Sequence, residues 1–212
     1  ALDYAKSLAI VGGRNASIIG RKTAARFAFD LTNQDVRIIS GMARGIDASA
    51  AKGAMYANGE TGATIAVLGT GADVPYPVEN AELYEQIIIN GCVVSELPLG
   101  TQANPRHFPQ RNRIIAGLSE GVLVIEAGLK SGSLITAQLA QKQNKKLFAV
   151  PGTPGESRTQ GSNLLIKKGA VLAEKAADIL PFLKGNKICP PPKKQKTAQK
   201  ILVFENNDAT FS

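Results

Sequence analysis

The feature that most constrains the fold of this chain is a regular alternation of short apolar runs with longer helical patterns. The apolar runs are not interrupted by alternating polar residues, which is typical of strands buried on both faces of a sheet. These runs cover residues 8–11, 36–40, 64–68, 92–95, 121–125, 146–150 and 170–172. Helical patterns follow them at 18–31, 45–56, 80–90, 111–118, 134–143, 162–168 and 176–183. This order predicts an α/β fold, with a doubly wound, mostly parallel sheet and helices on both faces.

The length of 212 residues suffices for one sizeable domain and a fragment. We expect the α/β domain to occupy residues 1–184. Residues 185–200 combine Pro190-Pro-Pro192 with several lysines, so we expect a basic linker there. Residues 201–212 are too short to fold alone and are interpreted as the start of a further domain. Because the chain begins with Ala1 rather than Met, we expect it to be part of a longer protein.

The composition of the chain limits the classes of function that we expect for it. The chain has 25 Lys and Arg against 17 Asp and Glu, a net charge of +8, which favours a polyanionic partner. Cys92 and Cys189 lie far apart and His107 is the single histidine, so we expect neither a disulfide framework nor a metal site. No apolar run approaches the ~18 residues of a membrane span, and no signal-peptide pattern opens the chain. We therefore expect a soluble, cytoplasmic protein.

The segment that begins at Phe108 carries the strongest sign of a binding site. The ring of Phe108 offers a flat face for a nucleotide base, and Arg111, Asn112 and Arg113 offer hydrogen bonds to phosphate. Arg106 adds to the positive charge, and His107 is interpreted as a contact or a bystander. The alternative is that Phe108 fills the core while the arginines face water.

Two further loops follow strands, and in doubly wound sheets ligands bind beyond the carboxyl ends of the strands. The loop after the first strand brings Arg14 and Ser17 to the start of a helix, which suits one phosphate. The loop after the second strand contains the binding candidates Ser40, Gly41, Arg44 and Gly45. Asp47 there either caps the next helix or orients Arg44. The alternative for the first loop is a turn with a solvated arginine, and the alternative for the second loop is a glycine-rich turn with Asp47 as the N-cap.

The loop after the fifth strand places polar residues at the start of a helix. Lys130, Ser131, Gly132 and Ser133 are candidates for binding phosphate there, because the positive end of a helix attracts anions. Their order differs from that of a P-loop, and a helix capped by serine is the alternative. Glu126, just before them, either braces an arginine or forms a buried ion pair.

Several strings in residues 8–183 closely resemble, in order, the motifs of the DNA-processing protein A family, also called DprA or Smf. They are Val11-Gly-Gly-Arg14, Ser40-Gly-Met-Ala-Arg-Gly-Ile-Asp47, Tyr76-Pro77, Ser95-Glu-Leu-Pro98, Phe108-Pro-Gln-Arg-Asn-Arg-Ile-Ile-Ala116, Ser131-Gly-Ser-Leu-Ile-Thr-Ala137 and Val150-Pro-Gly152. One departure is Ala51, where the family usually has a histidine.

The resemblance implies an extended Rossmann-like fold and a homodimer. Because no Ser-His-Asp or Cys-His nucleophile arrangement is found, we also expect a protein that is not an enzyme and needs no cofactor. The resemblance implies binding of single-stranded DNA, which the protein would protect and load with RecA recombinase in natural transformation and recombination. It also implies DNA contacts by Arg14, by residues 40–44, and by Phe108 with Arg111, and a winged-helix-like domain beginning near Ile201. The alternatives from the residues themselves are a nucleotide-binding hydrolase and a nucleotide sensor.

Overall fold

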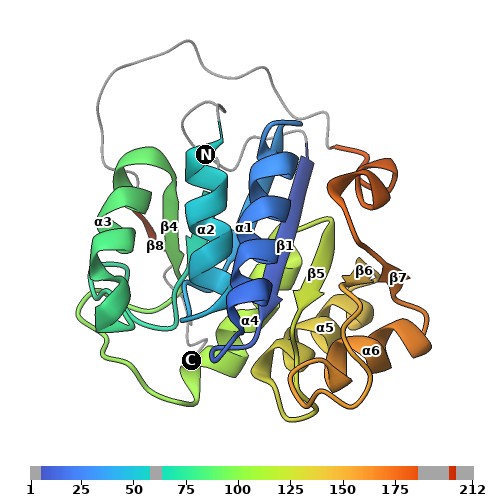
Figure 1. Ribbon diagram of the computed structural model, residues 1–212. Coiled ribbons are helices and arrows are strands. Elements are labelled where there is room, and N and C mark those ends of the chain that lie inside the picture. Colours follow the sequence, from blue (N-terminus) through green and yellow to red (C-terminus); the bar gives the residue numbers. More distant parts are fainter. Residues whose placement is uncertain (1–5, 58–63, 186–200, 204–212) are drawn as a thin grey trace, which may run out of the picture.

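The computed structural model describes residues 6–57, 64–185 and 201–203, and these form an α/β sheet structure (Figure 1). The strands of the described residues are β1 (Lys6–Gly12), β2 (Val36–Ser40), β3 (Thr64–Val67), β4 (Cys92–Ser95), β5 (Gly121–Ile125), β6 (Lys146–Ala149), β7 (Val171–Leu172) and β8 (Ile201–Val203). Their order across the sheet is β7-β6-β5-β1-β2-β3-β4-β8, and neighbouring strands are parallel. The predicted doubly wound parallel sheet is confirmed.

The central strand β1 shows why the apolar runs lack polar residues. Leu8 and Ile10 pack into one core, whereas Ala9 and Val11 pack into a second core on the opposite face. Successive side chains of a strand point to opposite faces, so both sets must be apolar when helices cover both faces.

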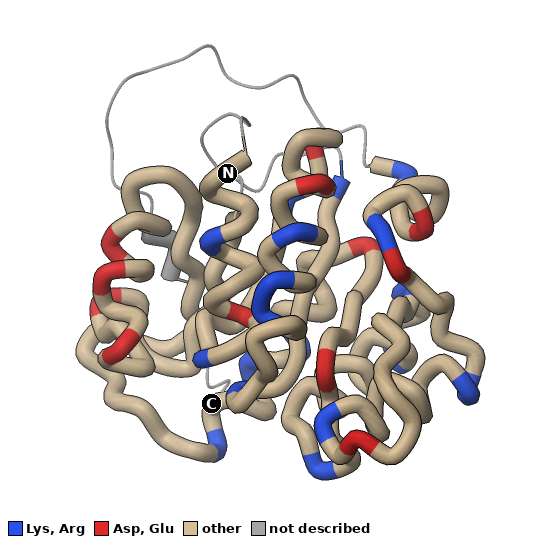
Figure 2. Tube along the Cα trace, in the orientation of Figure 1, with Lys and Arg blue, Asp and Glu red and all other residues tan. Residues whose placement is uncertain are grey.

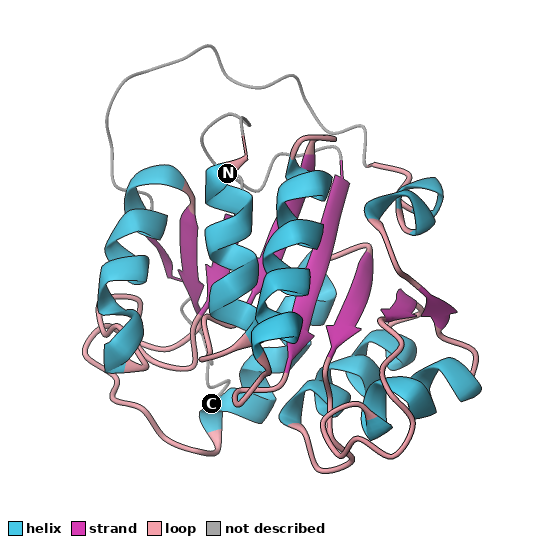
Figure 3. Ribbon diagram, in the orientation of Figure 1, coloured by secondary structure: helices cyan, strands magenta, loops and turns pink. Residues whose placement is uncertain are grey.

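The helices form two layers around the sheet (Figure 3). They are α1 (Ile18–Thr32), α2 (Ile46–Tyr56), α3 (Ala81–Asn90), α4 (His107–Leu118), α5 (Gly132–Lys142) and α6 (Gln160–Lys167). Helices α1 to α3 contribute to the cores on one face, and α4 to α6 contribute to the core on the other face. Acidic residues gather on α3 and basic residues lie along α1 (Figure 2). Among the described residues, no helix has the length and apolar character needed to span a membrane.

The strand order reverses between β1 and β5. Strands β2, β3 and β4 follow β1 outward on one side, while β5, β6 and β7 run outward on the other. The loops that leave β1 and β5 therefore lead to helices on opposite faces of the sheet. Such a switch point opens a crevice at the carboxyl edge of the sheet, and the candidate site lies there.

Two helical expectations need correction. Helix α4 begins at His107 rather than at Arg111, so Phe108 and Pro109 lie in its first turn. Proline is tolerated there because the first amides of a helix have no partner within the helix. The expected helix at 176–183 is instead two short 3₁₀ turns, Ala176–Asp178 and Leu180–Phe182. Pro181 in the second turn has no amide to donate.

After residue 185, the structure describes only residues 201–203. Residues 201–203 form β8, which pairs with β4 and so adds a strand to the main sheet. The predicted linker lies mostly at 186–200, outside the described residues, as do residues 204–212. The expectation that a further domain begins near Ile201 stays a prediction.

Candidate functional site

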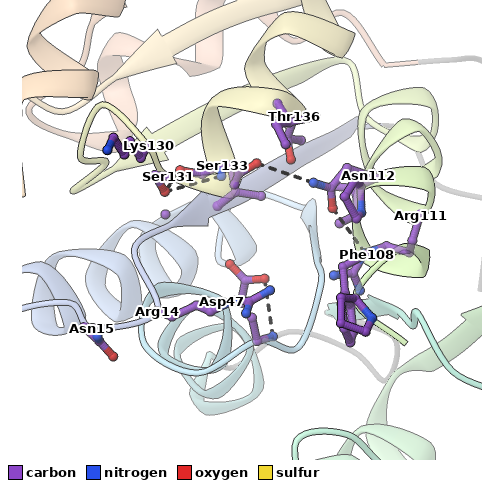
Figure 4. Close-up of a pocket in the computed structure, with 18 of the residues that line it drawn as sticks. Arg14, Asn15, Asp47, Phe108, Arg111, Asn112, Lys130, Ser131, Ser133 and Thr136 are labelled. Atoms are coloured by element: carbon purple, nitrogen blue, oxygen red, sulfur yellow. Dashed lines mark hydrogen bonds between the residues drawn. The ribbon is translucent and has the colours of Figure 1, made fainter. Parts of the chain in front are cut away.

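A cavity of about 560 Å³ opens at the switch point (Figure 4). Its walls come from the loop after β1, the loop after β2, the start of α4 and the start of α5. Several of the predicted binding residues line it together: Arg14, Phe108, Arg111, Asn112, Lys130, Ser131, Gly132 and Ser133. Segments more than 100 residues apart in the sequence thus meet at one cavity.

One wall of the cavity is aromatic. The rings of Phe108 and Tyr76 stack with their centroids 5.4 Å apart and their planes inclined by 27°. Phe108 is half-buried, whereas Tyr76 is 39% exposed. Gly69 makes room for this pair, because a Cβ there would lie 2.7 Å from Cδ1 of Phe108. Phe108 therefore neither fills the core nor stands free in solvent, and the pair leaves aromatic surface accessible.

Two exposed cations flank this wall. Arg14 projects from the loop after β1, and its guanidinium carbon lies 5.6 Å from the centroid of Phe108, within cation–π range. Lys130 also lines the cavity, from the loop between β5 and α5. Within the described part of the chain, neither side chain forms an ion pair. Both charges are therefore available to an anion that enters.

Arg111 has a different environment, since it is only 7% exposed. Its guanidinium donates to the carbonyl oxygens of Gly41, at 2.8 Å, and of Val67. Asp47 lies nearby, and its carboxylate accepts hydrogen bonds from the amides of Gly41 and Ala43. A Cβ on Gly41 would lie 2.6 Å from Nη2 of Arg111 and 2.9 Å from Oδ2 of Asp47, so glycine is required between them.

Burial dominates the protonation of both groups. It raises the pKa of Asp47 to about 6, although the charge of Arg111 and the two amides lower it. It lowers the pKa of Arg111 to about 10, against the attraction of Asp47. The two groups remain oppositely charged at neutral pH, and the hydrogen bond from Arg111 to the Gly41 carbonyl ties the loop after β2 to α4.

The start of α5 forms the inner wall. The hydroxyl of Ser131 caps the helix, accepting a hydrogen bond from the amide of Ser133 at 3.4 Å. The hydroxyls of the two serines lie 2.7 Å apart. Asn112 approaches from α4, and its amide nitrogen lies 3.5 Å from the carbonyl oxygen of Gly132. The helix cap and the predicted phosphate-binding segment are therefore compatible, because the capping residue Ser131 also lines the cavity.

The loop after β1 is held in place by Glu126. Its carboxylate accepts hydrogen bonds from the amide of Ser17, at 2.7 Å, and from the hydroxyl of Ser17. Ser17 also caps α1 by accepting from the amide of Gly20. Glu126 thus braces a serine rather than an arginine, and it is not among the residues that line the cavity.

The other predicted residues do not line the cavity. Ser40 is buried, and its hydroxyl donates to the carbonyl oxygen of Ile10. Arg44 pairs with Glu79 at 3.1 Å, and the charge of Asp47 acts on Arg111 instead. Arg113 pairs with Glu96.

Three further predicted binding residues, Gly41, Gly45 and Arg106, also do not line the cavity. Gly41 separates Arg111 from Asp47, as described above. Gly45 adopts φ +76° against the backbone of Gly13 and Arg14, which favours glycine. Arg106 is exposed beside the start of α4. Direct contact of any of these residues with DNA stays a prediction.

This arrangement offers groups that can bind an anion. Its polar groups include hydroxyls, amides and exposed cations, and Asp47, the one carboxylate among the described residues that line it, is already hydrogen-bonded. Among the described residues, no group of three or more His, Cys, Asp or Glu side chains is placed to hold a metal ion. An extended anion with aromatic rings, such as a nucleic-acid strand, matches the cavity best.

Reasoning from the residue pattern missed the role of Tyr76. It ends the loop 69–76 that follows the third predicted strand, at the predicted binding edge of the sheet, but it was not among the predicted binding residues. Its contact with Phe108 connects residues that are 32 positions apart. The glycine-rich turn Gly69-Thr-Gly71, which precedes Tyr76 in the sequence, is a further local sign of a loop there.

Comparisons with known proteins agree with this picture. The sequence model of the family described as DNA recombination-mediator protein A matches residues 1–184. The chain is 44% identical over 177 residues to Protein Smf of Escherichia coli, covering 83% of this chain and 46% of that protein. It therefore spans less than half of the length of that relative.

Solved structures are similar as well. DNA processing protein A of Streptococcus pneumoniae superposes with a TM-score of 0.78 at 42% identity, covering 85% of this chain and 62% of that one. DNA processing protein A of Helicobacter pylori, whose structure was described for its single-stranded DNA binding mode, gives a TM-score of 0.77 at 31% identity, covering 85% and 80%. The chain therefore belongs to the DNA recombination-mediator protein A family.

Proposed function

We propose that this part of the chain binds single-stranded DNA in the cavity at the switch point. The observation that carries the proposal is that two cations without an ion pair among the described residues, Arg14 and Lys130, line the same cavity as the stacked rings of Phe108 and Tyr76. Cations attract the phosphate backbone, and accessible aromatic surface stacks with bases that a duplex would hide. The relative from Helicobacter pylori, described as binding single-stranded DNA, supports this assignment.

The roles of the residues divide by exposure. Arg14 and Lys130 attract the backbone, and the aromatic pair stacks with one or two bases. Arg111 and Asp47 are positioning residues, because both are buried and fix the loop after β2 against α4. The small number of accessible rings implies that most of the affinity is electrostatic and falls with salt.

We extend the proposal to the whole protein by family membership. It protects single-stranded DNA and hands it to a RecA recombinase, works as a homodimer, and acts by binding rather than by catalysis. The partly exposed apolar residues Leu172 and Phe182, on the last elements of the α/β domain, are candidates for the dimer contact. Sedimentation equilibrium of wild type and of Leu172→Glu tests the dimer, and a shift of the variant to monomer is expected.

The DNA proposal is tested by fluorescence anisotropy with labelled oligo-dT, a duplex of equal length and dTMP, each at two salt concentrations. Preferential, salt-sensitive binding of the single strand is expected. Equal affinity for dTMP and the oligomer would instead favour a nucleotide sensor. Release of thymine or phosphate from dTMP would favour a hydrolase, a reading that loses support because Glu126 is hydrogen-bonded to Ser17.

A further inference from the structure

The inner wall of the cavity contains a buried hydroxyl with no partner. Thr136, one turn into α5, is 1% exposed and lines the cavity. Among the described residues, none hydrogen-bonds with its hydroxyl. Figure 4 shows this oxygen directed toward Ser133 and Asn112. Buried hydroxyls are normally hydrogen-bonded, often to a carbonyl of the preceding helical turn, so this one is available to a ligand.

The groups around Thr136 are also donors. The amide of Asn112 is oriented by Arg111, whose Nε donates to Oδ1 of Asn112 at 3.3 Å. A guanidinium has no acceptor, so the Asn112 atom beside Arg111 must be the oxygen, and the nitrogen faces the start of α5. The hydroxyls of Ser131 and Ser133 complete the set, at the positive end of an eleven-residue helix.

We propose that this inner wall is a subsite for one phosphoryl group, held by Thr136, Asn112 and the two serines. The inference rests on the proposed binding of single-stranded DNA and adds to it the place of one phosphate. A phosphoryl group accepts several hydrogen bonds at once, which matches converging neutral donors. The carboxylate of Asp47 does not compete, because its Oδ2 accepts from the amides of Gly41 and Ala43.

The subsite differs from the cavity mouth in its response to salt. Arg14 and Lys130 carry charge and contribute through counterion release, whereas the inner donors are neutral. Removing an inner donor should therefore lower affinity by a similar factor at every salt concentration. Removing a cation at the mouth should instead flatten the dependence on salt.

The test compares Thr136→Val, which removes the hydroxyl and keeps the shape, with Thr136→Ser, which keeps the hydroxyl. Thr32→Val is the matched control, since Thr32 is also buried with an unpaired hydroxyl but does not line the cavity. Anisotropy is measured with 5′-phosphorylated and 5′-hydroxyl oligo-dT at two salt concentrations. Thr136→Val should bind roughly tenfold more weakly with an unchanged salt slope, while the other two variants stay within about twofold of wild type.

The two oligonucleotides identify the source of the phosphoryl group. An equal loss for both indicates an internal phosphodiester, and a loss confined to the 5′-phosphorylated strand indicates a terminal phosphate. Wild-type affinity of Thr136→Val for both strands overturns the inference while leaving the proposed function intact.

A second readout does not depend on DNA. Inorganic phosphate should raise the thermal unfolding midpoint of wild type and Thr136→Ser, but not that of Thr136→Val. If wild type bound no oligonucleotide, the proposed function would fail, and this phosphate response would still support the subsite. An equal response of wild type and Thr136→Val would count against the subsite.

Discussion

The two sides of the cavity use the same type of residue for opposite purposes. On the side of β1 and β5, Arg14 and Lys130 are exposed and have no ion pair among the described residues. On the side of α4, Arg111 is buried and donates to two carbonyl oxygens, and Arg113 pairs with Glu96. The first side offers charge to a ligand, and the second side uses charge to fix the shape of the site.

The difference shows that a cluster of arginines in a sequence does not reveal which of them meets the ligand. Burying a guanidinium costs free energy unless its donors and its charge are matched, as the Gly41 and Val67 carbonyls and Asp47 match those of Arg111. An exposed arginine costs little and keeps its charge for a partner. Variants on the two sides should therefore change different measured quantities.

The largest effect is expected for Arg111→Ala. The change leaves two carbonyl oxygens without their donor and the Asp47 carboxylate without its opposite charge. We expect the free energy of unfolding to fall by about 3–5 kcal/mol, measured by urea denaturation. Arg113→Ala is the control, and its exposed ion pair should cost about 1 kcal/mol or less. Equal losses for the two variants would contradict the assigned roles.

The next effect is expected for Phe108→Ala. Loss of stacking should weaken binding of oligo-dT by about 1–3 kcal/mol at every salt concentration. Phe29→Ala is the matched control, because Phe29 is 38% exposed on α1 and does not line the cavity. Anisotropy titrations at two salt concentrations separate this loss from an electrostatic one. A variant that bound as tightly as wild type would remove the aromatic wall from the proposed groove.

The buried pair also predicts a dependence of stability on pH. The pKa of Asp47 is raised in the folded state, so between about pH 4 and pH 6 the folded state holds more protons than the unfolded state. Stability from this group is therefore largest below pH 4 and declines as pH rises to about 6, by at most ~1.4 kcal/mol per pH unit.

Asp47→Asn should remove that decline, since the amide oxygen can still accept from the backbone and does not titrate. Urea denaturation at intervals from pH 4 to pH 7 measures both proteins, and their difference isolates Asp47 from the other carboxylates. Parallel curves for wild type and the variant would show that Asp47 titrates normally.

The smallest effects are expected for Arg14→Ala and Lys130→Ala. Each should lower affinity modestly and reduce the slope of log affinity against log salt by about 0.7, the value for one phosphate of a single strand. Arg26→Ala, which removes a cation paired with Asp30 on α1, is the control and should leave the slope unchanged. A larger change in the salt slope for Arg111→Ala than for Arg14→Ala would contradict the roles assigned to the buried and the exposed arginine.

The fold was largely predictable because buried parallel strands carry an unmistakable apolar signal. The position of the site follows from the same topology, and the residue pattern predicts Phe108, Arg14 and Lys130 as binding residues. The residue pattern did not predict the burial of Arg111, since its partners are backbone carbonyls that any sequence provides. Tyr76 and Thr136 depend on contacts between distant segments, which periodicity and spacing do not encode.

Photochemical crosslinking tests the central claim most directly. Oligo-dT carrying 5-iodo-deoxyuridine is irradiated in complex with the wild-type chain, and the adducts are mapped by tryptic digestion and mass spectrometry. We predict adducts on residues 107–111, which contain Phe108, or on residues 53–106, which contain Tyr76, and their reduction in Phe108→Ala. Adducts confined to residues outside the cavity, such as the basic segment 185–200, would contradict the assignment of the single-stranded DNA site.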